Sequence, residues 1–217
     1  MGEFTWSKKR RNETHLRFRP FLGATATSPW FVRKLQRGRC GSNRTIFPRV
    51  KIARVTLSDR ATAGVYADVS GPEIERIAGQ FFDEPLDWVR VLMSDDRVEL
   101  ETALRRLIDE ESCPLILTTG GTGPTPRDIT PEATRAVVEK ELPGFGEIMR
   151  MQSYAKVRTA ILSRATAGVC GRSLIVNLPG RPRAIEECLP LLMPAIAECL
   201  DHIAGFRPKL RSVAKQE

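Results

Sequence analysis

Four short polar or glycine-rich segments carry the side chains best suited to chemistry, and each directly follows a run of apolar residues. They are Ser58-Asp59-Arg60, Ser94-Asp95-Asp96, Gly120-Gly121-Thr122-Gly123 with Arg127-Asp128 behind it, and Asn177-Leu178-Pro179-Gly180. Glycine at three of the four positions of the third segment lets backbone N–H groups approach an anion closely, and its threonine adds a hydroxyl donor. Asp95 and Asp128 are suited to hold Mg²⁺ between the oxygens of a triphosphate. The residue types therefore indicate phosphate chemistry.

Each of these segments also has an ordinary structural interpretation. The glycine turn matches neither a Walker A loop nor G-x-G-x-x-G, and such a turn after a strand is often only a tight connection. Asp95 suits the first turn of a helix, and Asp128 suits a turn in which it pairs with the preceding arginine. Asp59 suits a strand-end cap or, with Arg60, a grip on an anion. Asp96 is an alternative to Asp95 as the residue that faces a metal.

The elements that must position these residues alternate between strands and helices. Four apolar runs predict strands, at residues 50–57, 88–93, 114–119 and 173–178. Between them, apolar spacings of three and four predict one helix that buries Ile74, Ile77, Ala78 and Phe81, and a second that follows Ser94 as N-cap and buries Leu100, Leu104, Leu107 and Ile108. Helices are predicted from the Thr130-Pro131 start, with Thr130 as N-cap, to about residue 156. A closing helix buries Ile185, Leu189, Leu192, Ile196, Leu200 and Ile203, and we expect Pro190 and Pro194 to kink or break it.

This alternation predicts an α/β fold of three layers, in which a mostly parallel sheet has helices on both faces. In an open parallel sheet, ligands bind outside the carboxyl ends of the strands. We therefore expect the four segments, far apart in sequence, to meet at one rim. The hexapeptide Arg-Ala-Thr-Ala-Gly-Val occurs twice, at residues 60–65 and 164–169, and is interpreted as coincidence because the flanking elements differ in order.

The charge of the chain is concentrated at its beginning. Its 217 residues, 41% of them hydrophobic, suffice for one domain, and the formal net charge is +8. Residues 1–49 hold 12 Lys and Arg against 2 acidic residues, so residues 50–217 hold 22 basic against 24 acidic. We predict a basic, mostly disordered extension over 1–49, a folded domain over 50–205 and a C-terminal tail over 206–217. The nearly neutral domain argues against a nucleic-acid partner. The extension is open to interpretation as a targeting peptide, a native extension or a start-site artefact.

The remaining composition excludes several other classes of protein. The longest apolar stretch, 189–200, contains two prolines and is short of the about 20 residues that cross a bilayer, so no membrane association is expected. The five cysteines are scattered without a C-x-x-C pair, which argues against disulfides and zinc and favours the cytoplasm; they are Cys40, Cys113, Cys170, Cys188 and Cys199. His15 and His202 suggest no histidine mechanism.

The string from Thr118 to Thr134, Thr-Thr-Gly-Gly-Thr-Gly-Pro-Thr-Pro-Arg-Asp-Ile-Thr-Pro-Glu-Ala-Thr, resembles the molybdopterin adenylyltransferase family of molybdenum cofactor biosynthesis. The likeness extends to Ser58-Asp59-Arg60-Ala61 with Gly64-Val65-Tyr66, to Pro143-Gly144-Phe145-Gly146-Glu147 with Met149-Arg150, and to Asn177-Leu178-Pro179-Gly180-Arg181-Pro182. It spans about residues 50–205.

The resemblance implies a trimeric protein that joins the terminal phosphate of molybdopterin to AMP from ATP, uses Mg²⁺ and releases pyrophosphate. It implies a product that awaits molybdate insertion, and hence a hand-over to the molybdate-inserting enzyme. By motif, Asp95 and Asp128 match two essential aspartates of the family, which would hold the metal. The segments that match its nucleotide and pterin cleft are Gly120, Gly121, Thr122 and Gly123, with Pro179 and Gly180, and Ser58 and Asp59 also look like cleft residues.

Three alternatives remain at this point. One is a non-catalytic pterin- or nucleotide-binding or scaffold module of the same fold. A second is a sister branch with the same reaction or its tungsten-cofactor counterpart. A dinucleotide-dependent oxidoreductase is disfavoured, because it requires G-x-G-x-x-G after the first strand, where Ser58-Asp59-Arg60 stands.

Overall fold

Six strands form one sheet in the computed structural model, which describes residues 49–211. The strands lie in the order β2-β1-β3-β6-β5-β4. Their bounds are Val50–Leu57 for β1, Leu86–Met93 for β2, Leu115–Thr119 for β3, Lys140–Glu141 for β4, Ala167–Cys170 for β5 and Ser173–Leu178 for β6. β2, β1, β3 and β6 are parallel, whereas β5 runs antiparallel to β6 and to β4. The mostly parallel sheet expected from the sequence is confirmed.

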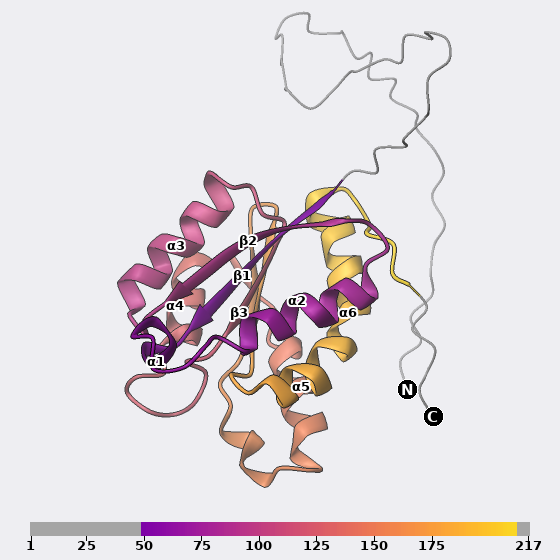
Figure 1. Cartoon of the computed structure of the whole chain (residues 1–217). Coiled ribbons are helices and arrows are strands. Elements are labelled where there is room, and N and C mark those ends of the chain that lie inside the picture. Colours follow the sequence, from indigo (N-terminus) through magenta and orange to yellow (C-terminus); the bar gives the residue numbers. More distant parts are fainter. Residues whose placement is uncertain (1–48, 212–217) are drawn as a thin grey trace, which may run out of the picture. The chain divides into compact units, whose positions relative to one another are not determined.

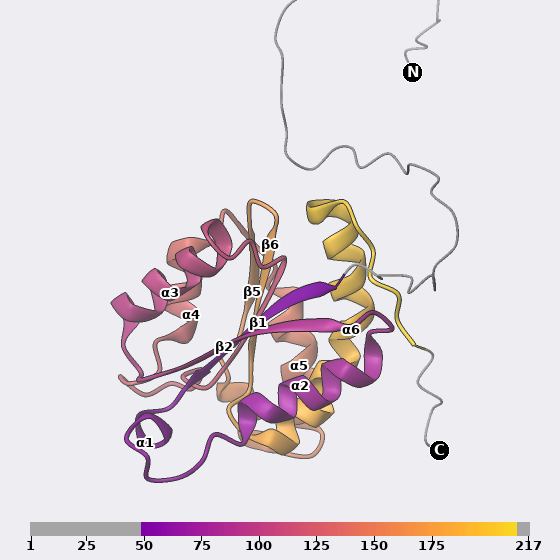
Figure 2. The same cartoon turned by 45° about the horizontal axis from the view of Figure 1, so that its top comes forward.

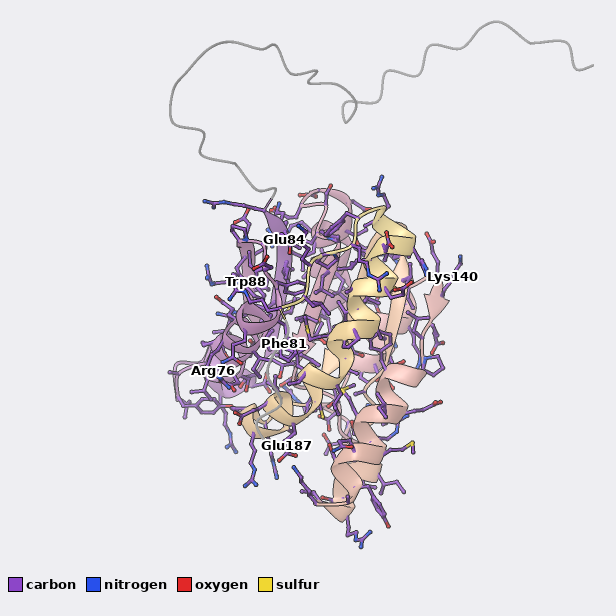
Figure 3. The ribbon with its side chains drawn as sticks, turned by 90° about the vertical axis from the view of Figure 1, so that its right-hand side faces the viewer. Arg76, Phe81, Glu84, Trp88, Lys140 and Glu187 are labelled. Atoms are coloured by element: carbon purple, nitrogen blue, oxygen red, sulfur yellow. The ribbon has the colours of Figure 1, made fainter. Side chains whose placement is uncertain are left out.

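Helices cover both faces of this sheet, so the molecule has three layers (Figures 1 and 2). On one face lie α2 (Ser70–Phe81), α5 (Gly144–Tyr154) and α6 (Pro182–Ala204), and on the other lie α3 (Arg97–Asp109) and α4 (Thr130–Val137). Two short helices complete the set: α1 (Asp59–Thr62), directly after β1, and the 3₁₀ helix η1 (Arg158–Leu162). Figure 3, in which α6 faces the viewer, shows Trp88 of β2 and Lys140 of β4 at opposite sides of the molecule, as the two edge strands require.

The core divides into two apolar clusters because successive side chains of a strand point to opposite faces. Leu115 and Leu117 of β3 pack with α2 and α6, whereas Ile116 between them packs with α3 and α4. All three are fully buried. The central strands are therefore apolar on both faces, and this explains why their sequences are continuous rather than alternating apolar runs.

One buried cation interrupts this core. Arg54 of β1 is 9% exposed and forms ion pairs with Asp68, at 2.6 Å, and with Glu75 of α2, at 2.7 Å. Glu75 also pairs with Arg90 of β2 at 2.7 Å. Asp68 in turn accepts a hydrogen bond from the Gly71 N–H at 2.9 Å. The network fixes the start of α2 against two strands.

The sequence misplaced several element boundaries. Asp96, not Ser94, is the N-cap of α3, and its Oδ1 accepts a hydrogen bond from the Glu99 N–H at 2.9 Å. Ser58 caps a short helix, α1, where a loop was expected. α4 begins at Thr130 and its N-cap is Ile129, so the predicted N-cap, Thr130, is instead the first residue of the helix.

The predicted helical stretch from Thr130 to residue 156 is interrupted by β4, and the strand β5 was not predicted at all. These two short strands form the antiparallel edge of the sheet. In contrast, the two prolines of α6 do not break it, because the helix is continuous from Pro182 to Ala204. It changes direction along its length (Figure 1), as prolines inside a helix require.

Residues 206–211, assigned to the tail, lie against α2. Leu210 forms a β-bridge with Phe82, and the Arg211 N–H donates to the Phe81 carbonyl at 2.7 Å. Residues 1–48 and 212–217, which hold the basic extension with Cys40 and His15, lie outside the described residues. Within residues 49–211, none of the helices has the length and apolar character needed to cross a membrane. The two copies of the repeated hexapeptide have different structures: residues 60–65 span α1 and a turn, and residues 164–169 lead into β5.

Candidate active site

The carboxyl ends of the parallel strands bring the four predicted segments to one rim. The Ser58 N–H, after β1, donates to the Met93 carbonyl at the end of β2 at 2.9 Å. Thr119, the last residue of β3, donates from its hydroxyl to the Pro179 carbonyl after β6 at 2.7 Å. Ser70, at the start of α2, donates to the Gly180 carbonyl at 2.8 Å. Residues separated by more than a hundred positions are thus direct neighbours.

The glycine turn at the centre of this rim has a backbone that only glycine fits. Gly120 and Gly121 have φ angles of 97° and 60°, in the left-handed region. A Cβ on Gly120 would lie 2.2 Å from the Leu57 carbonyl oxygen. Thr130, at the start of α4, holds the same turn through two hydrogen bonds. Its hydroxyl donates to the Gly120 carbonyl at 2.8 Å, and its N–H donates to the Gly121 carbonyl at 3.0 Å. Tight packing leaves the turn little freedom to move.

Asp95 lies on one side of the turn. A Cβ on Gly121 would lie 3.2 Å from its Oδ1. Burial, followed by the negative charge of Asp59, raises the pKa of Asp95, with a smaller upward contribution from Asp128, while Arg127 acts against the shift. Asp96, by contrast, is exposed and is used as the cap of α3. Of the two adjacent carboxylates, Asp95 therefore faces the glycine turn.

Asp128 lies beside Gly123 of the same turn. A Cβ on Gly123 would lie 2.8 Å from its Oδ2, and that oxygen accepts hydrogen bonds from the Thr125 N–H at 2.9 Å and the Thr125 hydroxyl at 2.6 Å. Burial acts to raise the pKa of Asp128, but the hydrogen bonds from Thr125 and Gly123 and the charge of Arg164 outweigh it and lower the pKa. Asp128 is thus held as a carboxylate.

Ser58 and Asp59 support the rim rather than pointing freely into it. The Ser58 hydroxyl accepts from the Ala61 N–H at 3.2 Å and hydrogen-bonds the Tyr66 hydroxyl at 2.9 Å. Asp59 accepts from the Asp95 N–H at 3.1 Å and forms an ion pair with Arg127. Asp59 therefore joins the loop after β1 to the Asp95 loop and to Arg127.

Arg164 is a residue of this site that sequence reasoning missed. It precedes β5, and its guanidinium and backbone N–H contact the glycine turn, the Asp128 carbonyl and Glu132 of α4. Site residues are expected after the parallel strands of such a sheet, whereas Arg164 comes before an antiparallel strand, β5. Its only sequence signal was the repeated hexapeptide, which was set aside.

Two cavities open next to each other at this rim, one bordered by the glycine turn and one by the Asp128 loop. One, of about 640 Å³, is bordered by the turn and by the Pro179-Gly180 loop. It is basic on balance, because four cations, Arg150, Lys156, Arg181 and Arg183, line it together with one carboxylate, Glu187, which pairs with Lys156 and Arg183. The other, of about 400 Å³, is lined by Asp128, Arg164 and the Pro124-Thr125-Pro126 segment. Gly123 and Pro124 stand at the border, since Pro124 lines both cavities.

The oxygen donors at this rim fit Mg²⁺ only if a ligand completes the coordination. Within residues 49–211, no cluster of three or more His, Cys, Asp or Glu side chains can hold a metal alone. Asp95 and Asp128 supply two carboxylates, and Mg²⁺ in proteins is commonly bound by one or two carboxylates together with substrate phosphates and water. The donor set is that of a metal site shared with a phosphate ligand.

Comparison with known proteins gives the same assignment. The family described as "Probable molybdopterin binding domain" matches residues 53–198. The molybdopterin adenylyltransferase of Helicobacter pylori (strain J99 / ATCC 700824) is 49% identical over 172 residues, which covers 74% of this chain and 98% of that relative. The molybdopterin adenylyltransferase of Escherichia coli (strain K12) is 46% identical over 184 residues, covering 74% and 94%. The crystal structure of the molybdopterin biosynthesis enzyme MoaB from Thermus thermophilus has a TM-score of 0.67 at 37% identity, covering 74% of this chain and 99% of that one.

The three-layer α/β fold with its mostly parallel sheet defines the class of protein, that of the solved molybdopterin biosynthesis proteins. Within that class, the chain belongs to the molybdopterin-binding domain family. The family resemblance seen in the sequence is confirmed.

Proposed function

We propose that this protein is a molybdopterin adenylyltransferase, which transfers AMP from ATP to the terminal phosphate of molybdopterin and releases pyrophosphate. The observation that carries the proposal is that Asp95 lies beside Gly121 and Asp128 beside Gly123, so that both carboxylates adjoin one glycine turn. The identity of 49% to a curated enzyme of that name, over nearly its whole length, supports it. The protein is then an enzyme of molybdenum cofactor biosynthesis and a nucleotidyltransferase.

The reaction requires the management of charge rather than a nucleophilic side chain. An oxygen of the molybdopterin phosphate forms a bond to the α-phosphorus of ATP, and the bond from that phosphorus to the bridging oxygen breaks. The electron pair leaves with pyrophosphate. Both reactants are anions, so the site must offset their repulsion while it holds them in line. The backbone N–H groups of residues 120–122 and the Thr122 hydroxyl would contribute to this.

Asp95 and Asp128 would hold Mg²⁺ at this rim. The ion, when bound, supplies positive charge that neutralises the triphosphate and makes the α-phosphorus easier to attack. A cation beside Asp95 also offsets the burial and the two neighbouring negative charges that disfavour its ionised form. Ser58 and Asp59 would keep the Asp95 loop in position.

The basic cavity is suited to receive molybdopterin. It borders Gly123, Pro179 and Gly180, and its cationic side chains complement a phosphate-bearing ligand. Its volume of about 640 Å³ lies within the range of small-molecule sites. The phosphate end of the ligand would point to the glycine turn, and the pterin would lie toward α5 and α6.

We further propose a homotrimer that works in the cytoplasm and passes its product to a molybdate-inserting enzyme. Several apolar side chains of α5 and η1 are exposed, among them Met151, Ile161 and Leu162, at 72%, 65% and 54%, which supports burial against another copy. The four cysteines of the described residues are free thiols, in keeping with a reducing compartment. Light scattering during size exclusion would measure the oligomer.

The test is direct. The purified protein is mixed with ATP and molybdopterin, with Mg²⁺ or with EDTA, and pyrophosphate and adenylylated molybdopterin are measured. We expect both products only with Mg²⁺, in equal amounts, and restoration after EDTA when Mg²⁺ is returned in excess. ATP with a methylene group between its α- and β-phosphates is the control and should bind without reacting. Retention of both ligands without pyrophosphate would contradict the proposal and favour a non-catalytic binding module.

A further inference from the structure

Arg164 makes polar contacts to the glycine turn, to the Asp128 loop and to the helix that follows them. Its Nε donates to the Gly123 carbonyl at 2.7 Å, and its Nη2 donates to the Asp128 carbonyl at 2.6 Å. Its Nη1 forms an ion pair with Glu132 on α4. Three nitrogens of one planar guanidinium therefore hold three separate points of the loop and the helix that follows it.

The backbone of Arg164 adds a fourth contact, which reaches the Asp128 carboxylate through one peptide. The Arg164 N–H donates to the Thr122 carbonyl at 2.8 Å. In a trans peptide, the C=O and the following N–H point in opposite directions. The N–H on the other side of that peptide belongs to Gly123, which lies beside Asp128, since a Cβ on Gly123 would lie 2.8 Å from Asp128 Oδ2. Fixing the Thr122 carbonyl thus fixes the orientation of the peptide next to the carboxylate.

Lysine cannot reproduce this set of contacts. A lysine ammonium is one point charge on a flexible stem, whereas the guanidinium presents its donors in a rigid fork. The carbonyls of Gly123 and Asp128 belong to opposite ends of the loop that carries Thr125. Bridging them requires the width of the fork, so charge alone is insufficient.

We propose that Arg164 is a positioning residue, which sets the geometry of the glycine turn and of Asp128 by closing the loop between residues 122 and 128. The expected effect of Arg164 on turnover rests on the proposed adenylyl transfer, whereas its effect on the geometry of the turn does not. Arg164 does not need to touch either substrate. Its role is to hold Asp128 where a metal shared with the triphosphate would be bound.

The experiment compares Arg164→Ala and Arg164→Lys with the wild-type full chain. We expect both to fold and Arg164→Ala to lose at least about tenfold in kcat, with a change in the KM for ATP below about threefold, because positioning errors act mainly on the transition state. Methylguanidinium added at millimolar concentration should restore part of the kcat of Arg164→Ala, since the Arg164 side chain is 35% exposed. Arg164→Lys should remain impaired despite its charge.

Arg135→Ala is the matched control. Arg135 also pairs with a glutamate, Glu141, at 3.2 Å, and it lies on α4 beyond the site. Its removal should leave kcat unchanged. Arg164 variants with a kcat within about twofold of the wild type would overturn the proposal. The proposal would also be overturned if the loss of kcat in both Arg164 variants were proportional to their loss of thermal stability and methylguanidinium did not restore activity.

A second readout separates this inference from the proposed function. With ¹⁵N-glycine labelling, the amide signals of Gly121 and Gly123 should shift or broaden in Arg164→Ala and Arg164→Lys, and should not in Arg135→Ala. This measurement requires no turnover. A wild-type protein that makes no pyrophosphate would refute the adenylyl transfer, and the amide signals would still decide the role of Arg164. Unchanged signals in both variants overturn it.

Discussion

Two adjacent carboxylates, Asp95 and Asp96, have different environments and therefore different roles. Asp95 lies beside Gly121, and Asp96 accepts the Glu99 N–H as the cap of α3. The sequence left this choice open, because residues next to each other share the same composition and the same predicted loop. Only the direction of each side chain distinguishes them, and that direction follows from where α3 begins.

The substitutions Asp95→Asn and Asp96→Asn test this difference with the same chemical change at neighbouring positions. We expect Asp95→Asn to lose about 3 kcal/mol or more of transition-state stabilisation, a hundredfold or larger drop in kcat/KM. Asp96→Asn should retain activity, because asparagine caps a helix as well as aspartate does. Asp128→Asn should resemble Asp95→Asn. Initial rates of pyrophosphate release measure all three, and a dead Asp96→Asn beside an active Asp95→Asn would reverse the assignment.

Asp95→Asn should also keep or raise the thermal stability of the protein at neutral pH. The substitution removes a partly buried negative charge that lies near Asp59 and Asp128, and it nearly preserves the shape of the side chain. Differential scanning calorimetry would show an unchanged or higher Tm. A large fall in Tm would mean that the charge of Asp95 stabilises the fold, which contradicts its surroundings.

At the scale of elements, the central strands were predictable and the edge was not. The runs at 50–57 and 173–178 were located to the residue, because each is a mostly apolar, largely buried segment that ends in polar or glycine-rich sequence. β4 and β5 hold two and four residues, too few to give a period. Arg164 was missed for the same reason, since its position at the rim depends on the antiparallel direction of β5.

Gly120→Ala tests the rigidity of the glycine turn. The new Cβ would lie 2.2 Å from the Leu57 carbonyl oxygen and would sit at a positive φ. We expect a loss of about 3 kcal/mol or more in the free energy of unfolding, or failure to fold. Gly64→Ala is the control: its φ is 71°, but its Cβ meets open space, so strain alone should cost about 1 kcal/mol. Equal losses in urea unfolding would contradict the close packing of the turn.

The ion pairs that join α2 to β1 and β2 predict how stability depends on pH. The pKa of Glu75 lies below its ordinary value of 4.5, mainly because Arg90 donates a hydrogen bond to its carboxylate. Burial acts to raise this pKa, and a hydrogen bond from Arg54 lowers it further. Because the folded-state pKa is depressed, the stabilisation is present above the unfolded pKa and is lost as the pH falls through the folded pKa. Glu75→Gln should therefore be less stable than wild type at neutral pH, and the difference should shrink below about pH 4.

Urea unfolding at several pH values measures that difference. Glu110→Gln, which changes an exposed residue at the end of α3, is the control and should show no comparable pH-dependent gap. A gap between Glu75→Gln and wild type that stays constant down to about pH 3 would contradict a role for the ionised carboxylate.

At the scale of the whole molecule, the relatives indicate which part of the chain is sufficient. The Helicobacter pylori protein is covered over 98% of its length by 74% of this chain. The family match begins at residue 53, after the segment that carries the excess of positive charge. The activity and the fold are thus expected to reside in residues from about 46 onward.

Deletion of residues 1–45 should accordingly leave the Tm and the rate of adenylyl transfer largely unchanged. The deletion leaves β1, which begins at Val50, intact. Calorimetry and pyrophosphate assays of the full-length and shortened proteins, at equal salt concentration, measure the effect. A collapse of the fold or a large loss of activity would show that the basic segment is part of the working structure.

Pro124 lines two openings, the basic cavity beside Pro179 and Gly180 and the cavity beside Asp128. If each reactant binds through its own cavity, both can be bound at the same time. The kinetics should then be sequential, with either reactant binding first and intersecting lines in double-reciprocal plots. An adenylylated protein should never accumulate, since two cavities that meet at Pro124 would let the reacting ends come together without attaching either of them to the chain.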